Sequence, residues 1–210
     1  MVCFADVSKL SRVFSKAGYH IACIGRSADN LSKLGKEITE AGGHVSYRVL
    51  SPWSIFSCLS LSPKALPFCI ENYSDQQLES TWHEIRNNFS SDKYVISAAL
   101  WNAGHGVWKP FLDITPEEVR ESLNVNIEAA FSFSRNAIKT FKDNEIDPAN
   151  GARGTLIFTG ATASLRGNVT TSAFAAGKFG LRGLSQSLAK EFGKQNIHVA
   201  HVSCGAYYQS

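Results

Sequence analysis

The stretch GTLIFTGATASLRGNVTTSAFAAGKFGLRGLSQSLAKEFGKQNIHVAHV, residues 154–202, decides the fold. Its first seven residues are largely apolar and end in glycine, which predicts a buried strand. Apolar residues then recur every three or four positions and predict a helix with one apolar face; they are Leu181, Leu184, Leu188 and Phe192. The segment IHVAHV at 197–202 has the composition of another strand. This order of elements is typical of a parallel βαβ unit.

Upstream of this unit, the same alternation of strand and helix recurs. Apolar runs predict strands at 19–25, 45–50 and 94–104. Helical periodicity predicts helices over 6–17, 28–42, 74–89 and 116–142. We therefore expect an α/β fold, a Rossmann-like doubly wound parallel sheet, in a single domain that spans residues 1–210.

Helix starts carry capping signals, which support this assignment. Ser27 is a predicted N-cap, and Ser74 with Gln77 forms a predicted capping box. Thr115, Pro116 and Glu118 supply a cap, a first-turn proline and a reciprocal acceptor for the longest helix. One apolar stripe of that helix is expected to pack on the sheet; it comprises Val119, Leu123, Ile127 and Phe131.

Two regions depart from the pattern. Residues 51–70 hold three of the six prolines and one charged residue, Lys64, without helical or strand period, and are predicted to be an irregular insertion. At the amino terminus only MVCF precedes the first helix, and the first glycine is Gly18. We therefore expect a sheet that lacks most of its first strand and its final strand, with no readable glycine-rich phosphate turn.

Composition excludes several classes of protein. The chain of 210 residues is 44% hydrophobic and 19% charged with a net charge of +3, which is typical of a folded globular protein. The scattered charges argue against a nucleic-acid partner, and the prolines within 51–70 argue against a membrane span. Five cysteines without metal-ligand spacing predict reduced thiols and no metal site. Without a secretion signal, the expected location is cytoplasmic.

Three segments together carry a family resemblance. WNAG at 101–104, NVNIEAAF at 124–131 and the quoted segment from FTGATASLRG onward resemble the short-chain dehydrogenase/reductase family. The likeness spans about residues 8–48 and 72–202. It implies a nicotinamide-dependent oxidoreductase, dimeric or tetrameric, that acts on a small-molecule alcohol or carbonyl substrate. It also implies a homodimer contact through the helices at 116–142 and 171–193.

The resemblance breaks down at two catalytic positions. The family uses a tyrosine as acid or base four residues before a lysine that lowers its pKa. Lys178 matches the lysine, but Phe174 stands at the tyrosine position and Ala161 at the position of the family's serine. Neither side chain carries a hydroxyl, so catalysis is expected to be impaired. Thr162 or Ser164 offers a replacement hydroxyl, although the favoured interpretation of Ser164 is a turn residue.

Two further residues have roles implied by the resemblance. Lys178 matches the lysine that also holds the nicotinamide ribose, a role that does not require the tyrosine. The alternative for Lys178 is an exposed helix lysine. Asn126 matches the helix asparagine that holds a water in the family's proton path, and the alternative is an asparagine that only braces its helix.

The expected cofactor is NADP in preference to NAD. Asn102, Ala103 and Gly104 resemble the family's turn beside the adenosine part of the dinucleotide. At the end of the second strand, where NAD-preferring folds place an acidic residue, this chain has Arg26 followed by Ser27. A guanidinium and a helix N-terminus suit the additional phosphate of NADP. The alternative is a solvated arginine near a helix start.

Three hypotheses about function remain open. The first is an NADP-dependent oxidoreductase with weakened catalysis. The second is a non-catalytic member that pairs with another subunit through its long helices. The third is a product of altered splicing, in which residues 51–70 and 204–210 are translated intervening sequence.

Overall fold

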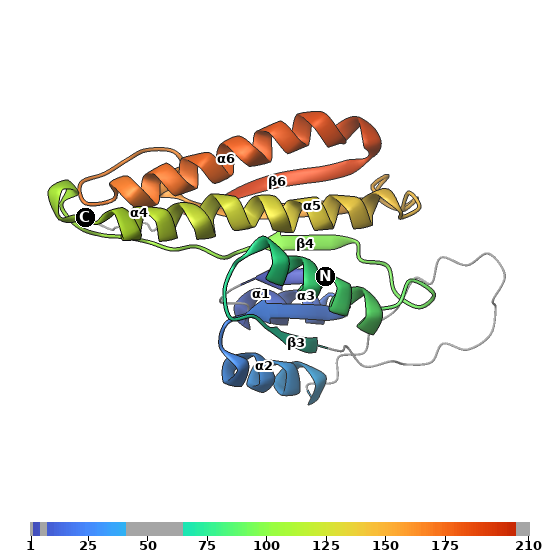
Figure 1. The fold of residues 1–210 in the computed structure, drawn as a ribbon. Helices are drawn as coiled ribbons and strands as arrows, with labels where there is room; N and C mark the ends of the chain where they lie inside the picture. The colour runs from blue at the N-terminus through green and yellow to red at the C-terminus, as the bar shows by residue number, and fades with distance from the viewer. Residues whose placement is uncertain (1, 5–7, 41–64, 205–210) are drawn as a thin grey trace.

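Six parallel strands form one sheet in a computed structural model that describes residues 2–4, 8–40 and 65–204 (Figure 1). The spatial order is β3-β2-β1-β4-β5-β6, which confirms the predicted Rossmann-like fold. The strands are β1 (Val2–Phe4), β2 (Ile21–Gly25), β3 (Ala65–Cys69), β4 (Ala98–Trp101), β5 (Gly154–Ala161) and β6 (Ile197–Cys204).

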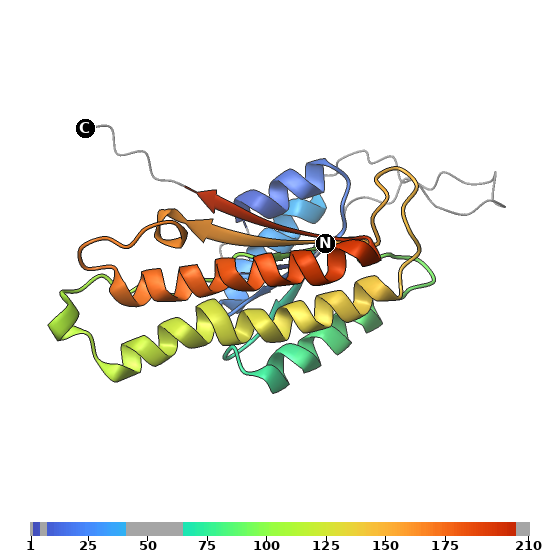
Figure 2. The same ribbon diagram turned by 90° about the horizontal axis from the view of Figure 1, so that it is seen from above.

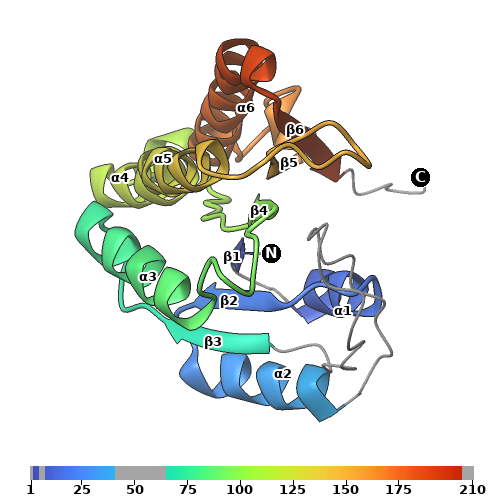
Figure 3. The same ribbon diagram turned by 90° about the vertical axis from the view of Figure 1, so that its right-hand side faces the viewer.

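Helices cover both faces of the sheet. They are α1 (Ser8–Lys16), α2 (Ala28–Glu40), α3 (Asp75–Asn88), α4 (Pro116–Leu123), α5 (Ala129–Lys142) and α6 (Ser172–Phe192). Figure 3 shows α1 and α2 apart from α3, α5 and α6, which lie on the opposite face. Seen from above in Figure 2, α4 and α5 lie end to end, and α6 runs beside them along the sheet. This layering is that of a doubly wound α/β fold.

Short helical turns complete the described segments. A π-helix, η2 (Asn124–Glu128), joins α4 to α5. The 3-10 turns are η1 (Phe111–Asp113), η3 (Thr162–Ser164) and η4 (Gly193–Gln195). The sequence predicts one uninterrupted helix over 116–142, so the π-turn is a correction to that prediction.

Residues Val2–Phe4 supply the central strand that the sequence nearly lacks. β1 pairs with β2 from Val2 to Phe4 and with β4 at Val2 and Cys3. It has three residues, whereas β5 has eight, so the expectation of a much-shortened first strand is confirmed. The backbone of β2 and β4 nevertheless finds partners here, because β1 lies between them. The expected loss of a final strand concerns residues beyond β6, and 205–210 lie outside the described residues.

A strand lies within the region expected to be an irregular insertion. β3 occupies Ala65–Cys69 and pairs with β2, so the prediction for 51–70 is wrong for these residues. Pro67 makes the segment look unlike a strand, but β3 is at the sheet edge, where a missing backbone donor is tolerated. The predicted strand at 45–50 and the rest of the insertion, 51–64, lie outside the described residues.

Three of the four residues in the apolar stripe predicted to pack on the sheet face outward instead, and the fourth, Ile127, is half-buried against Gly180 of α6. Val119, Leu123 and Phe131 are exposed, whereas Phe133 is buried. The buried side of α5 is made largely of small residues, Ala129, Ala130 and Ala137 among them. The α4–α5 segment therefore has two apolar faces. The inner one also carries the fully buried Phe133 and Phe141, and most of the predicted stripe lies on the outer one. The stripe of α6 follows the prediction, since Leu181 and Leu184 are buried in the core.

The capping signals are confirmed to different degrees. Thr115 Oγ1 accepts from the backbone N–H of Glu118, whose carboxylate accepts from the N–H of Thr115, so this capping box is complete. Ser74 caps α3 by accepting from the N–H of Gln77. The Gln77 side chain accepts from the N–H groups of Glu71 and Asn72 rather than from Ser74, so the predicted reciprocal bond is wrong. The Gln77 side-chain oxygen therefore stabilises the loop before α3 rather than the N-cap residue itself.

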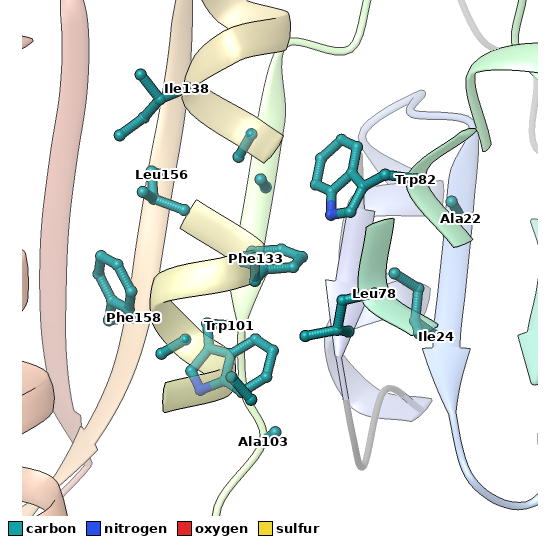
Figure 4. Close-up of a cluster of buried hydrophobic side chains, with 14 of the residues drawn as sticks. Ala22, Ile24, Leu78, Trp82, Trp101, Ala103, Phe133, Ile138, Leu156 and Phe158 are labelled. Atoms are coloured by element: carbon teal, nitrogen blue, oxygen red, sulfur yellow. The ribbon is translucent and has the colours of Figure 1, made fainter. Parts of the chain in front are cut away.

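An aromatic cluster fills the core between the sheet and α3, α5 and α6. In Figure 4, Phe133 of α5 lies between Trp82 of α3 and Trp101 of β4. Its ring centroid is 5.5 Å from that of Trp82 and 5.2 Å from that of Trp101. These three fully buried side chains fix α3 and α5 against the end of β4, where the site begins. Among the described helices, none combines the length and apolar character needed to cross a membrane.

Candidate functional site

The candidate site lies at the carboxyl ends of β4 and β5. In open α/β sheets, ligands bind at this edge, where the strand order reverses. The turn after β4 carries Asn102, Ala103 and Gly104, and the segments that flank it are η2 and α6. Ala103 is buried, and Asn102 is half-buried and already engaged in an interaction. The structure therefore brings three sequence-predicted residues to one turn.

Lys178 of α6 is buried at this edge rather than exposed on its helix. Only 5% of the residue is accessible to solvent, and its Nζ donates to the backbone oxygen of Thr159, 3.0 Å away. A Cβ placed on Gly104 would lie 3.1 Å from this Nζ. The absence of a side chain at Gly104 thus leaves the ammonium close to the turn after β4. This placement argues against the solvated alternative for Lys178.

Asn126 is fully buried in the π-turn, opposite Lys178. Its Nδ2 donates to the backbone oxygens of His105 and Ser122, each 2.8 Å away. Its Oδ1 is buried and has no hydrogen-bond partner among the described residues. A Cβ on Gly104 would lie 3.4 Å from this oxygen. Asn126 therefore braces the helix and the loop through Nδ2 and keeps a free acceptor beside Gly104, and π-turns of this kind recur at functional sites.

Phe174 stands one helical turn before Lys178 on α6. The Lys178 Nζ lies 5.9 Å from the centroid of the Phe174 ring, within range of a cation–π contact. The ring also packs against Trp108, with centroids 5.2 Å apart. Ala161 ends β5 close to the same edge. Phe174 and Ala161, which occupy the positions where the family has hydroxyl groups, thus lie at this edge of the sheet. Neither side chain has a hydroxyl.

Ser164 is part of the 3-10 turn after β5. Its Oγ accepts a hydrogen bond from the backbone N–H of Ala161 at 3.1 Å, and the residue is fully buried. The hydroxyl therefore holds the turn together. This contact supports the interpretation of Ser164 as a turn residue over that of a replacement catalyst.

Arg26 lies at the carboxyl end of β2, where it is exposed. Its guanidinium lies 5.2 Å from the centroid of the Tyr73 ring, which comes from the loop after β3. Burial raises the pKa of the Tyr73 phenol, so this ring stays neutral near pH 7. Ser27 Oγ accepts from the N–H of Asn30 at 3.4 Å and caps α2. The pair Arg26–Ser27 thus combines a cation with a helix N-terminus.

Three residues near the site were not predicted from the sequence. Tyr73 contacts Arg26, Trp108 contacts Phe174, and His201 packs against Gly160. The sequence offers a signal for two of them, and it is compositional. Trp108 is a tryptophan in a glycine-rich turn, and His201 is a histidine within an apolar strand. The turn between β1 and α1, residues 5–7, lies outside the described residues. In the described part of the chain, no three His, Cys, Asp or Glu side chains gather as a metal site.

Comparison with known proteins agrees with this geometry. Residues 57–208 match the family described as short chain dehydrogenase, which covers more than two thirds of the chain. The chain belongs to the short-chain dehydrogenase family. It is 24% identical over 198 residues to carbonyl reductase family member 4 of Xenopus laevis, an alignment that covers 93% of this chain and 68% of that protein.

Solved structures share the fold closely. A short-chain dehydrogenase from Rhodopseudomonas palustris superposes with a TM-score of 0.75 at 26% identity, covering 96% of this chain and 82% of the other. A metagenomic short-chain oxidoreductase in complex with NADP gives a TM-score of 0.77 at 19% identity, covering 98% and 81%. The second match, given its low identity, shows the fold alone.

Proposed function

We propose that this short-chain dehydrogenase family member binds NADP and acts on a small-molecule alcohol or carbonyl compound with weakened catalysis. One observation carries the proposal. Lys178, Asn126 and Gly104 meet at the carboxyl end of β4, whereas Phe174 and Ala161 beside them lack a hydroxyl. The binding half of the site is retained, and the proton-transferring half is missing.

The residues present fit a nicotinamide dinucleotide at two places. At one, the unpartnered Oδ1 of Asn126 and the ammonium of Lys178 lie beside Gly104, where no side chain intervenes. An acceptor next to a cationic donor suits the hydroxyls of a ribose, directly or through water. At the other, Arg26 and the start of α2 suit a phosphate.

The proposed division of labour follows from these positions. When bound, a nicotinamide would supply or accept a hydride. Lys178 would hold the ribose, Arg26 and Ser27 would bind the 2′-phosphate, and Asn102, Ala103 and Gly104 would flank the adenosine side. Asn126 would orient the ribose side through its free oxygen. No side chain at position 161 or 174 can give a proton to a carbonyl oxygen, so a general-acid contribution of about a hundredfold to ten-thousandfold is forfeited.

Names of similar proteins support the reaction class and a nicotinamide cofactor. Carbonyl reductase family member 4 of Xenopus laevis is among the similar proteins, and the metagenomic short-chain oxidoreductase was solved in complex with NADP. Position 26 carries an arginine where NAD-preferring folds have an acidic residue, and this favours NADP over NAD. A cytoplasmic, reducing location is part of the proposal and is consistent with the free thiols of Cys23 and Cys69.

We also propose that the chain forms a homodimer through the outer apolar face of α4, α5 and α6. Val119, Leu123, Phe131 and Phe179 are exposed there. A groove on this face is lined by both apolar and charged residues, among them Ile127 and Arg120. Large apolar side chains that gather on one face are typical of an interaction surface.

The second candidate function is a non-catalytic binding subunit. The same outer face favours it, because this surface does not depend on Phe174 or Ala161. In this case the chain would bind nucleotide and pair with a catalytically intact relative, without turnover of its own.

Fluorescence titration of the purified protein with NADPH and with NADH tests the proposal. Tight NADPH binding with slow carbonyl-dependent oxidation supports the weakened enzyme. Tight binding without any turnover across a panel of ketones supports the binding subunit. Failure of both nucleotides to bind overturns both candidates.

A further inference from the structure

His201 of β6 packs against the end of β5. We call the last three residues of β5 and the 3-10 turn η3 that follows, residues 159–164, the site turn. A Cβ on Gly160 would lie 2.1 Å from the His201 Cε1 and 2.5 Å from its Nε2. The imidazole thus occupies the space that any side chain at position 160 would need. The Ser164 Oγ lies 2.8 Å from the same Cβ position, so the hydroxyl and the imidazole approach Gly160 together.

Three basic side chains support the site turn from the same layer. Lys178 donates to the Thr159 backbone oxygen at 3.0 Å. Arg182, one turn further along α6, donates to the Ser164 backbone oxygen at 3.4 Å. His201 packs against Gly160, the residue that follows Thr159. The two cations therefore hold the backbone at both ends of this segment, and the imidazole packs on it beside the first of these contacts.

The surroundings of His201 favour its neutral form. Its Nε2 is buried and has no hydrogen-bond partner among the described residues. Burial has the largest effect and lowers the His201 pKa, and the positive charges of Arg182 and Lys178 on α6 lower it further. A hydrogen bond with the backbone of His201 raises this pKa by less, so the pKa is lowered overall. The facing residues of β5 and η3, Gly160 and Ser164, carry no charge. A proton on His201 would add a third positive charge to this layer.

We propose that neutral His201 is a positioning residue for the site turn and Lys178, and that its protonation releases this turn and weakens nucleotide binding in mild acid. The nucleotide part rests on the proposed function. The apparent affinity for the nucleotide falls in proportion to the fraction of molecules that still hold the site turn in place. The free energy of unfolding should change in the same direction. A histidine in the unfolded chain binds a proton near pH 6.5, whereas the folded His201 binds it at lower pH. The contribution of His201 to stability is therefore lost as the pH falls below about 6.5.

The ligand-free test compares the thermal midpoint of the full chain at pH 7.5 and pH 5.5. His201→Gln keeps a polar side chain but cannot titrate. His198→Gln, an exposed histidine of the same strand, is the matched control. The midpoint should fall more in the wild type and in His198→Gln than in His201→Gln. Equal falls in all three proteins would overturn the proposal.

Nucleotide binding supplies the second readout. Calorimetry measures the dissociation constant of NADP at pH 7.5 and at pH 5.5. Its rise between these two pH values should be about threefold to tenfold larger in the wild type than in His201→Gln. The titration of the 2′-phosphate affects both proteins and cancels in this comparison. An equal rise in both would overturn the link to binding. Absence of NADP binding at pH 7.5 would overturn the proposed function, whereas the ligand-free comparison would still decide the role of His201.

A measurement on the unaltered chain covers the case in which His201→Gln does not fold. Proton NMR follows the titration of the six histidines through their ring protons. One half-buried histidine should titrate below pH 6.5, and its resonance should move when Lys178 or Arg182 is replaced. If every histidine titrates at or above pH 6.5, the proposal is wrong.

Discussion

At the scale of single residues, the proposed site would separate binding from proton transfer. Lys178 is anchored to the Thr159 backbone oxygen independently of position 174, so its placement does not require a tyrosine. Asn126 keeps its position through hydrogen bonds to His105 and Ser122. Phe174 packs on Trp108 as an ordinary aromatic residue. None of these contacts requires a hydroxyl at position 161 or 174.

Replacing Lys178 tests the binding half. Lys178→Met keeps the length of the side chain and removes the charged donor, and charge-assisted hydrogen bonds contribute about 1.5–3 kcal/mol. We expect the NADPH dissociation constant to rise about tenfold to a hundredfold in a fluorescence titration. Lys190→Met, an exposed lysine of the same helix, should leave it unchanged. Equal affinity of Lys178→Met and the wild type would remove Lys178 from the nucleotide site.

Charge reversal at Arg26 tests the choice of cofactor. In Arg26→Glu the carboxylate repels the 2′-phosphate, so NADPH affinity should fall by about tenfold or more while NADH affinity stays within about threefold. Lys33→Glu on the exposed side of α2 controls for the change in net charge. The two nucleotides should be titrated against all three proteins at the same ionic strength. A parallel loss of both nucleotides in Arg26→Glu would contradict recognition of the phosphate.

At the scale of elements, periodic segments were predictable and exceptions were not. β5, α6 and β6 follow from their periodicity because each buries one face in the core. β3 was missed because Pro67 lowers its strand propensity, and only its place at the sheet edge makes proline acceptable. Trp108 and His201 reach the site through packing between elements distant in sequence, which no local pattern reports.

The outer face of α4 and α5 shows the same limit. The sequence identifies an apolar stripe correctly but assigns it to the sheet, because its periodicity alone does not show that a second set of residues, Phe133 and Ala137 among them, already packs on that side. Most of the predicted stripe is left on the surface, where Phe131 is 50% exposed. This leftover face is the element-level argument for a homodimer.

A single charge on this face tests the homodimer. Phe131→Glu should convert the dimer to a monomer, because association would bury an unpaired carboxylate. Light scattering coupled to size-exclusion chromatography measures the mass. Val95→Glu, another exposed apolar position away from this face, should remain dimeric. A wild-type protein that is monomeric at all concentrations tested would contradict the proposed interface.

At the scale of the whole molecule, the sheet is unevenly supported. β1 contributes three residues at the centre, and β4 pairs with it at only two positions. On the face that α1 and α2 cover, no described helix lies over β5 and β6 (Figure 3), and Val202 is half-exposed. Both features reduce the backbone pairing and the apolar burial that stabilise a domain.

Thermal unfolding tests this consequence. We expect a midpoint at or below about 50 °C for the isolated chain, near the lower end of mesophilic domains. Saturating NADPH should raise the midpoint, since a ligand that binds only the folded state stabilises it. Calorimetry on the same sample gives both values. A cooperative transition well above about 50 °C without ligand would show that the short central strand suffices.

Restoring the missing hydroxyls tests the central claim, that the scaffold binds nucleotide but lacks a proton donor. The measurement is the rate of ketone-dependent NADPH oxidation by the wild type and by the double variant Ala161→Ser/Phe174→Tyr, with Phe179→Tyr as a control that adds a hydroxyl elsewhere on α6. We predict a rate at least about a hundredfold higher in the double variant than in the wild type and the control. Fast, stereoselective reduction by the wild type, unchanged in the double variant, would contradict the account.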